Sequence, residues 1–299
     1  NSCNIISKYP ENLFHYPLSF ETLEDNLDSK IIYKIKKEIE LISKSDSSKS
    51  AKNFKEFMEG KVGILLTKMF FNDYPKKVWG IETDEMLADW APQRIELRKN
   101  NEPFYKKLFV AVGKMGTGHL YEEIINLMSK ENNFNFYKKK NLTDVIYKDN
   151  LITNLIFNDS ENIKIKEGDQ VFSTIPANNF AKFFNMDLSL KFRGVRSQYL
   201  FFKNEKILPR DYNWAYCSDK NISFNRITEP SSMTDKVSRK GYSHICVETT
   251  FLSGKQINFK NSFEEVLNWL KSHKSFNSEG HIPELNTENY ENYVYPIQD

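Results

Sequence analysis

The pattern of apolar and polar positions changes twice along the chain. In the first part, apolar side chains recur every three or four positions, which predicts helices over residues 20–28 and 30–43. A Ser- and Lys-rich linker follows at 44–51. From Asn53 the helical spacing resumes and predicts two helices that meet near Gly60. Residues 1–130 are therefore expected to form a mostly helical subdomain.

Beyond residue 131 the apolar period shortens to two. Phe134 and Phe136 alternate with polar residues, and further apolar runs are separated by Asp-Asn and Asn-Asp turns. An apolar strand is then predicted over 169–175, where Pro176 stops it, followed by a short helix at 178–184. Residues 131–185 thus predict a strand meander and one strand of a larger sheet.

The last part, 186–299, predicts antiparallel strands at 195–203, 212–217, 222–228 and 242–251. A late helix is the best-marked local element, because Ser262 and Glu265 have the spacing of a capping box before an apolar helix face. No complete series of alternating strands and helices is present. The fold class is therefore α/β, or α+β for the residues present.

Composition narrows the class of protein. The 299 residues are 39% hydrophobic and 27% charged, and the 42 basic residues nearly cancel the 40 acidic ones. This balance argues against nucleic acid or an acidic membrane surface as partner. No apolar run is long enough to insert into a membrane, and the chain is expected to be cytoplasmic. A homodimer is left open.

Several common kinds of site are not supported. The three cysteines and five histidines have no ligand or disulfide spacing, so no metal is expected. No G-x-S-x-G elbow is present for a serine hydrolase. The cluster from Gly113 to Gly118 reads G-x-x-G-x-G, which is not the dinucleotide fingerprint. It can be a tight turn beside a ligand, a plain helix-entry loop or, less readily, a pyrophosphate cradle.

Three other positions are candidates for a binding site. Trp79 ends a helix and can be core or a stacking platform. Arg94 lies four residues before Arg98, a spacing that could clamp a diphosphate or make salt bridges to the acidic residues of 82–85. Arg226 is expected at a strand end, with Glu229 as its potential carboxylate partner.

Taken in order, these segments resemble UDP-galactopyranose mutase and, more broadly, the FAD-dependent proteins of amine oxidase and protoporphyrinogen oxidase type. Residues 70–80, FFNDYPKKVWG, are similar to the mutase pattern F-F-x-x-Y-x-x-K-x-W-G. Residues 93–98 are similar to its R-x-P-V-R segment, although Glu96 replaces the proline. Tyr216-Cys217-Ser218 with RITE at 226–229, and YVYPI at 293–297, complete the resemblance, which spans nearly the whole chain.

The resemblance implies roles for five residues. Arg94 and Arg226 would hold the diphosphate of a nucleotide sugar, Tyr74 and Tyr295 would donate hydrogen bonds to it, and Trp79 would pack beside the sugar or nucleotide. It also implies reduced FAD, whose N5 attacks the anomeric carbon while UDP leaves. Contacts to the flavin are expected, weakly, from Gly113, Gly116 and Pro176. No residue is assigned as catalytic.

The resemblance further implies the central part of a Rossmann-like FAD-binding fold, with a helical subdomain and an antiparallel substrate-binding sheet. The family's N-terminal G-x-G-x-x-G and C-terminal flavin-contacting stretch have no counterpart here, so a fragment that binds FAD poorly is expected. The leading hypothesis is a mutase-like isomerase in cell-surface polysaccharide synthesis. An oxidoreductase of amine oxidase or protoporphyrinogen oxidase type, and a cofactor-free binding or vestigial domain, are the alternatives.

Overall fold

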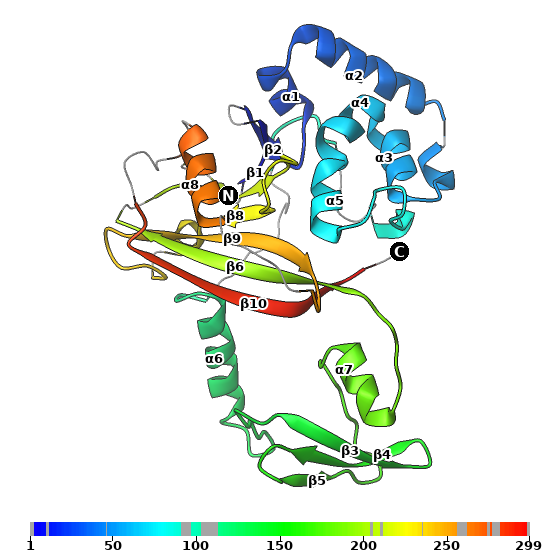
Figure 1. Ribbon diagram of the computed structural model, residues 1–299, viewed down its shortest axis with the longest axis vertical. Helices are drawn as coiled ribbons and strands as arrows, with labels where there is room; N and C mark the ends of the chain where they lie inside the picture. Colours follow the sequence, from blue (N-terminus) through cyan, green and yellow to red (C-terminus); the bar gives the residue numbers. More distant parts are fainter. Residues whose placement is uncertain are drawn as a thin grey trace. The chain divides into compact units, whose positions relative to one another are not determined.

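The chain forms two compact units in the computed structural model (Figure 1). One unit contains Asn1–Leu120 and Phe192–Asp299, and the other contains Tyr121–Lys191. The predicted helical subdomain (1–130) and the predicted late sheet (186–299) thus contribute to the same unit. The structure describes residues 3–9, 12–45, 47–90, 97–102, 113–203, 206–209, 212–234, 236–255, 262–273, 276 and 282–297.

A seven-stranded sheet organises the first unit, in the order β10-β6-β9-β8-β7-β1-β2. Its strands are β1 (Cys3–Tyr9), β2 (Asn12–Tyr16), β6 (Phe192–Phe202), β7 (Tyr212–Cys217), β8 (Arg226–Thr228), β9 (Ser243–Leu252) and β10 (Leu285–Pro296). Neighbouring strands are antiparallel except β1 and β7, which run parallel. The antiparallel sheet was predicted, but β1, β2 and β10 were not.

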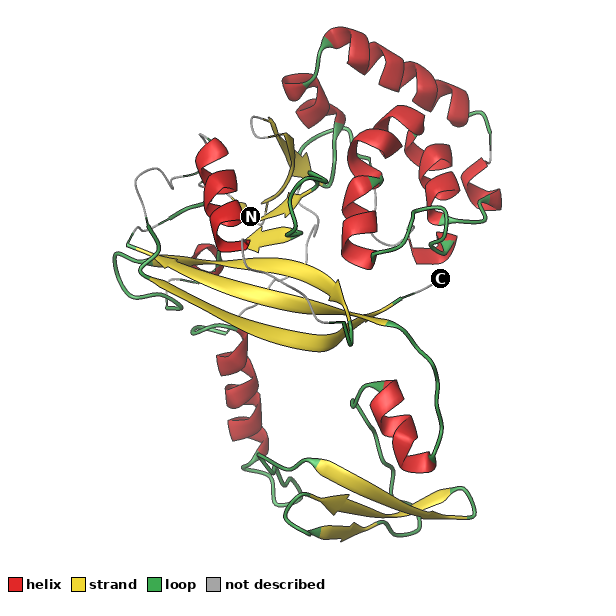
Figure 2. Ribbon diagram, in the orientation of Figure 1, coloured by secondary structure: helices red, strands yellow, loops and turns green. Residues whose placement is uncertain are grey.

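Helices gather beside this sheet in the same unit (Figure 2). They are α1 (Phe20–Asn26), α2 (Ser29–Ile42), η1 (Ser47–Ser50), α3 (Phe54–Val62), α4 (Ile64–Leu66), the π-helical turn η2 (Thr67–Phe71), α5 (Asp73–Trp79) and η3 (Ala88–Trp90). The helices predicted at 20–28 and 30–43 are confirmed. The break predicted near Gly60 instead falls at Gly63, where φ is 90° and a side chain would meet the carboxylate of Glu38.

Two hydrophobic cores lie on opposite faces of the sheet, because successive strand residues point to opposite sides. On one face Tyr216 packs with the core of the helical subdomain, which includes Phe14, Phe54 and Phe70. On the other face Cys217 packs with α8 (Ser262–Ser272) through a second core. Helix α8 therefore packs on one face of the sheet, and helices α1–α5 pack on the other.

The predicted late helix is confirmed as α8, but its capping-box residues make tertiary contacts. Ser262 Oγ accepts a hydrogen bond from Arg196 at 2.7 Å, and the Glu265 carboxylate accepts one from the amide of Ser223 at 2.9 Å. These two hydrogen bonds attach α8 to β6 and to the β7–β8 connection. The short turn η5 (Pro230–Ser232) lies between β8 and β9.

The second unit holds a three-stranded sheet in the order β3-β4-β5. Its elements are most of α6 (Thr117–Met128), β3 (Leu142–Lys148), β4 (Leu151–Phe157), β5 (Asn162–Lys164), α7 (Ala177–Ala181) and η4 (Lys182–Phe184). The meander over 142–164 agrees with the prediction, but Phe134 and Phe136 lie outside any strand. The strand predicted over 169–175 is also wrong, because no described strand pairs with it and Phe172 is 86% exposed.

This second unit has little core of its own among its described residues. Its buried hydrophobic residues are Val145 and Ala181, while large apolar side chains such as Phe172, Leu151 and Tyr121 are exposed. No parallel sheet occurs among the described residues of this unit. The helical subdomain and antiparallel sheet of the predicted fold are thus present, and the Rossmann-like part is not seen in the described ranges.

Candidate functional site

Helix α5 carries the first two site residues predicted from the sequence. Tyr74 lies in its first turn and Trp79 is its last residue. The helix ends there because Gly80 takes a left-handed conformation with φ 71°, and its amide donates to the carbonyl of Lys76 at 2.7 Å. The π-helical turn η2 precedes α5 and places it beside the sheet, with β9 as its neighbouring strand.

A polar row crosses the sheet next to α5. Tyr216 on β7 pairs with Arg226 on β8, which pairs with Glu248 on β9, and Glu248 pairs with Ser197 on β6. Residues paired in this way share one face of the sheet. Tyr216 belongs to the core beneath the helical subdomain, so the whole row faces α5 and its neighbours.

Arg226 and Glu248 form a two-pronged ion pair in this row. Nε of Arg226 donates to one carboxylate oxygen and Nη2 to the other, both at 2.6 Å. Burial disfavours the charge of Arg226, but Glu248 outweighs that effect and raises the pKa of Arg226 above its ordinary value. One third of the Arg226 side chain is exposed (33%), so its outer N–H groups can still reach a ligand.

Tyr74 packs onto this row. Its ring meets that of Tyr216 edge to face, with centroids 5.4 Å apart and an interplanar angle of 73°. Burial, and next the proximity of Tyr216, raise the pKa of Tyr74 well above 10, while the charge of Arg226 acts in the opposite direction. Tyr74 therefore keeps its proton and remains a hydrogen-bond donor near Arg226.

The other end of α5 brings together the second predicted pair. The rings of Trp79 and Tyr295 lie 5.6 Å apart at 61°. Tyr295 on β10 pairs with Arg193 on β6, whose Nε donates to the carbonyl of Val78 at 3.1 Å. Burial lowers the pKa of Arg193. The C-terminal end of α5 is thus held against β6 and β10 by an arginine that caps its carbonyl groups.

Four of the five predicted binding residues therefore lie along α5 and the sheet face beneath it, as two pairs. Tyr74 packs on Tyr216, which pairs with Arg226 across β7 and β8, and Trp79 packs on Tyr295. The fifth, Arg94, lies outside the described residues. Glu248 was not predicted from the sequence. It lies twenty-two positions from Arg226, and no local sequence pattern indicates that the two residues pair.

The expected partnership between Arg226 and Glu229 is wrong. Glu229 is fully buried, and its two carboxylate oxygens accept hydrogen bonds from the amides of Ile207 and Leu208 at 2.9 and 2.8 Å. Burial raises the pKa of Glu229. Because strand residues alternate between faces, Glu229 cannot share the side of β8 on which Arg226 points. It anchors the segment before β7 instead.

The glycines proposed to approach the flavin form a tight entry to α6. The amide of Gly116 donates to the carbonyl of Gly113 at 2.8 Å, and a side chain on Gly113 would lie 2.2 Å from the carbonyl oxygen of Gly116. Gly116 has φ 94°. Both glycines are thus required by the turn itself. Pro176 is the N-cap residue of α7.

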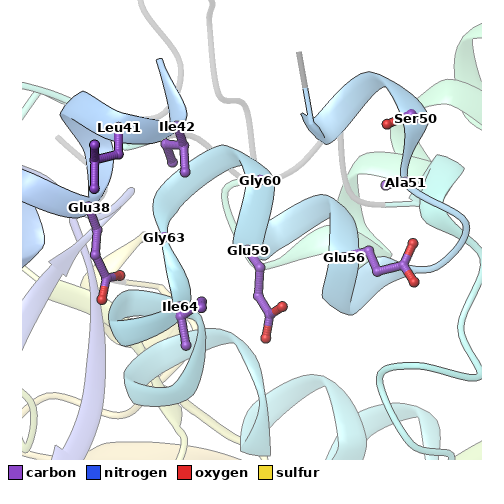
Figure 3. Close-up of a pocket in the computed structure, with 10 residues that line it drawn as sticks. All are labelled: Glu38, Leu41, Ile42, Ser50, Ala51, Glu56, Glu59, Gly60, Gly63 and Ile64. Carbon is purple, nitrogen blue, oxygen red and sulfur yellow. The ribbon is translucent and has the colours of Figure 1, made fainter. Parts of the chain in front are cut away.

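A separate groove lies in the helical subdomain, between α2 and α3 (Figure 3). It encloses about 480 Å³, and its lining includes Glu38, Leu41, Glu56, Glu59 and Gly63. Two of its carboxylates already accept backbone hydrogen bonds, from Leu65 to Glu38 and from Lys52 to Glu56. None of the four predicted binding residues that the structure describes lines this groove, so it is distinct from the α5 site.

Two further features bear on the class of site. Among the described residues, no group of three or more His, Cys, Asp or Glu side chains could hold a metal ion. The described helices also include none with the length and apolarity to cross a bilayer.

The fold belongs to a class shared by proteins with different activities. No family model and no curated protein matches the sequence. Among solved structures, similarity extends to a reduced UDP-galactopyranose mutase with a TM-score of 0.72 and 14% identity, covering 99% of this chain and 67% of that one. An oxidoreductase from Methanosarcina mazei is similar at 0.61 and 12%, covering 99% and 69%. A Rab GDI from Plasmodium falciparum is similar at 0.56 and 12%, covering 99% and 67%.

Proposed function

We propose that this chain provides the nucleotide-sugar site of a flavin-dependent enzyme, most closely a UDP-galactopyranose mutase-like isomerase acting in cell-surface polysaccharide synthesis. One observation carries the proposal: on α5, Tyr74 packs on Tyr216, the strand partner of Arg226, and Trp79 packs on Tyr295 of β10. All of these except Tyr216 are residues for which the resemblance implied substrate contacts. The similarity to solved structures supports the fold. Because a mutase, an oxidoreductase and a Rab GDI share this fold, it does not determine the activity.

In this proposal Arg226 binds the diphosphate. Glu248 occupies two of its N–H groups and fixes the plane of the guanidinium, and the remaining donors face the ligand. Tyr74, kept protonated, donates to the same phosphate oxygens. Tyr295 donates its phenolic hydrogen bond to the diphosphate, and Trp79, which is 9% exposed and packs on Tyr295, lies beside the sugar or nucleotide. The chain's contribution to catalysis is to bind and orient the diphosphate as it becomes the leaving group.

FAD enters the proposal through the family resemblance. The described residues do not fit an FAD phosphate cradle, because Gly113 and Gly116 are used by the entry turn of α6 and the G-x-G-x-x-G spacing is absent. When bound, FAD would supply the electron-rich centre that the mutase chemistry requires.

A redox flavoprotein of amine oxidase or protoporphyrinogen oxidase type is the second candidate, because the same sequence resemblance extends to those proteins. The two candidates differ in electron balance. The flavin of an oxidase is reduced stoichiometrically by the substrate. A mutase needs flavin that is already reduced, and its reaction leaves the oxidation state of the flavin unchanged. A cofactor-free binding domain is the third candidate.

Calorimetric titration with UDP and UMP tests the proposal. UDP is expected to bind at least about tenfold more tightly than UMP, because the second phosphate adds a charge-assisted contact of roughly 1.5–3 kcal/mol. Arg94→Ala should weaken UDP more than UMP. Equal affinity for UDP and UMP, or no binding by the folded chain, would contradict a diphosphate site.

The flavin part needs a separate measurement. Purified protein mixed with FAD is examined for bound flavin by its visible absorption, with the longest available form of the protein. Flavin that is reduced by a nucleotide sugar would favour an oxidoreductase, and nucleotide-sugar isomerisation only after dithionite reduction would favour the mutase. Absence of flavin binding in that form would leave the cofactor-free candidate.

A further inference from the structure

Lys77 is a buried cation that the proposed function does not use. It lies on α5 between Tyr74 and Trp79, and its ammonium donates to three backbone carbonyls: Asp219 at 2.8 Å, Phe224 at 2.9 Å and Ile222 at 3.2 Å. All three acceptors belong to the connection between β7 and β8. An ammonium group has three N–H donors, so each donor has one carbonyl partner.

The connection held by Lys77 joins two parts of the site. Tyr216 lies near the end of β7, before the connection, and Arg226 begins β8, after it. The backbone of Lys77 is fixed as well, since its carbonyl accepts from Oγ1 of Thr250 at 3.0 Å, two residues beyond Glu248 on β9. Lys77 thus ties α5 to the β7–β8 connection through its side chain and to β9 through its backbone carbonyl.

We infer that Lys77 is a positioning residue for the nucleotide-sugar site, whose protonated ammonium sets the placement of Tyr74 on α5 relative to Arg226 on β8. The inference rests on the proposed function for its ligand. Lys77 itself reaches only backbone carbonyls, so it acts on substrate through the residues that it holds. A positively charged group at this position also adds to the positive potential around the diphosphate.

The environment of Lys77 makes the contact sensitive to pH. Burial lowers the pKa of Lys77 to about 8, against the charges of Asp219, Glu265 and Asp73, which raise it. The neighbouring thiol of Cys217 remains neutral, because burial raises its pKa to about 12. A neutral amine has two N–H donors and cannot serve three carbonyls. Deprotonation therefore releases at least one carbonyl of the connection.

UDP affinity measured by calorimetry between about pH 7 and pH 9 tests this inference. If binding requires protonated Lys77, affinity should be constant below the pKa and fall by up to about tenfold per pH unit above it. Lys77→Arg keeps its charge throughout this range, so its affinity should not fall with pH. Lys77→Met should bind at least about tenfold more weakly at pH 7, with no decline towards pH 9.

Lys76→Met is the matched control. Lys76 is the preceding residue on α5, but it is exposed and pairs with Glu82, so its loss should leave both affinity and pH profile unchanged. A wild-type profile identical to that of Lys77→Arg, or wild-type affinity in Lys77→Met, would overturn the inference.

Hydrogen exchange distinguishes this failure from failure of the proposed function. Without ligand, Lys77→Met should accelerate amide exchange across residues 219–225, whereas Lys76→Met should not. If folded wild-type protein does not bind UDP, the proposed function fails, and unchanged exchange in Lys77→Met would then reject the role of Lys77 as well.

Discussion

The guanidinium of Arg193 occupies the space that a side chain at position 80 would need. A Cβ atom added to Gly80 would lie 2.5 Å from Nη1 of Arg193 and 2.8 Å from its Cζ. Gly80 also has the left-handed φ of 71°. Gly80→Ala is therefore expected to lower the free energy of unfolding, measured with urea, by about 1–3 kcal/mol through backbone strain and displacement of Arg193.

Gly254→Ala separates these two causes. Gly254 has a similar φ of 79°, but no atom lies within 4 Å of the Cβ that alanine would add, so only backbone strain destabilises this variant. Gly80→Ala should cost more than Gly254→Ala, and part of the excess should disappear when Arg193 is also replaced by Ala. Equal costs for the two glycine variants would mean that the close approach of Arg193 has no energetic weight.

Arg226 is expected to dominate the affinity for UDP. Arg226→Ala should weaken binding by about 1.5–3 kcal/mol, because it removes charge-assisted hydrogen bonds and leaves Glu248 to repel the diphosphate. Arg226→Lys should recover little of this loss, since lysine cannot form the two-pronged contact with Glu248. Calorimetry gives both values. An affinity close to wild type in Arg226→Ala would remove this residue from the site.

Tyr74→Phe isolates the contribution of one hydroxyl. The variant keeps the ring against Tyr216, so unfolding should change little, while UDP affinity should fall by about 0.5–1.5 kcal/mol. Tyr33→Phe is a suitable control, because Tyr33 is 67% exposed on α2. An ultraviolet pH titration of the folded proteins should show that the tyrosine lost in Tyr74→Phe ionises well above pH 10.

Glu229 should matter for stability rather than for binding. Glu229→Ala leaves the amides of Ile207 and Leu208 without their acceptor, at about 1–3 kcal/mol each, so the free energy of unfolding should fall by roughly 2–6 kcal/mol. Glu264→Ala, on an exposed position of α8, should be nearly neutral. A loss in Glu229→Ala no larger than in that control would contradict this role.

The carboxyl group of Glu229 should also make the free energy of unfolding depend on pH. Because burial raises the pKa of Glu229 above 4.5, the folded state binds its proton more tightly than the unfolded state does. Its contribution to stability is therefore complete below about pH 4.5 and declines as pH rises through the folded-state value. Urea unfolding of wild type and Glu229→Gln across that range should show the stability difference moving against wild type as pH increases.

The local elements that sequence patterns could predict are those with strong periodicity. The helices at 20–28 and 30–43 and the strands near 195–203 and 242–251 agree with the structure because each buries one regular face. The strand predicted over 169–175 shows the limit. Its apolar residues satisfy the pattern, but a strand also needs a pairing partner, and that depends on other parts of a fold.

Motifs in the sequence indicate candidate site residues, but they do not indicate which of those residues contact one another. Tyr74, Trp79, Arg226 and Tyr295 were named from motifs, whereas the contacts of Arg226 follow from the register of three strands. Glu229 is near Arg226 in sequence, and Glu248 is near it in space. Lys77 belonged to a recognised segment, but three carbonyl partners give no signal in a sequence.

The parallel pairing of β1 with β7 has a consequence for the order of folding. It joins residues about 200 positions apart, so a chain emerging from the ribosome makes β1 and β2 long before β7 exists. Until then, the β1 edge that β7 will pair with is an unsatisfied strand edge, which can template association with other chains. The large sheet can therefore be completed only after most of the chain has been synthesised, and we expect a correspondingly slow final step.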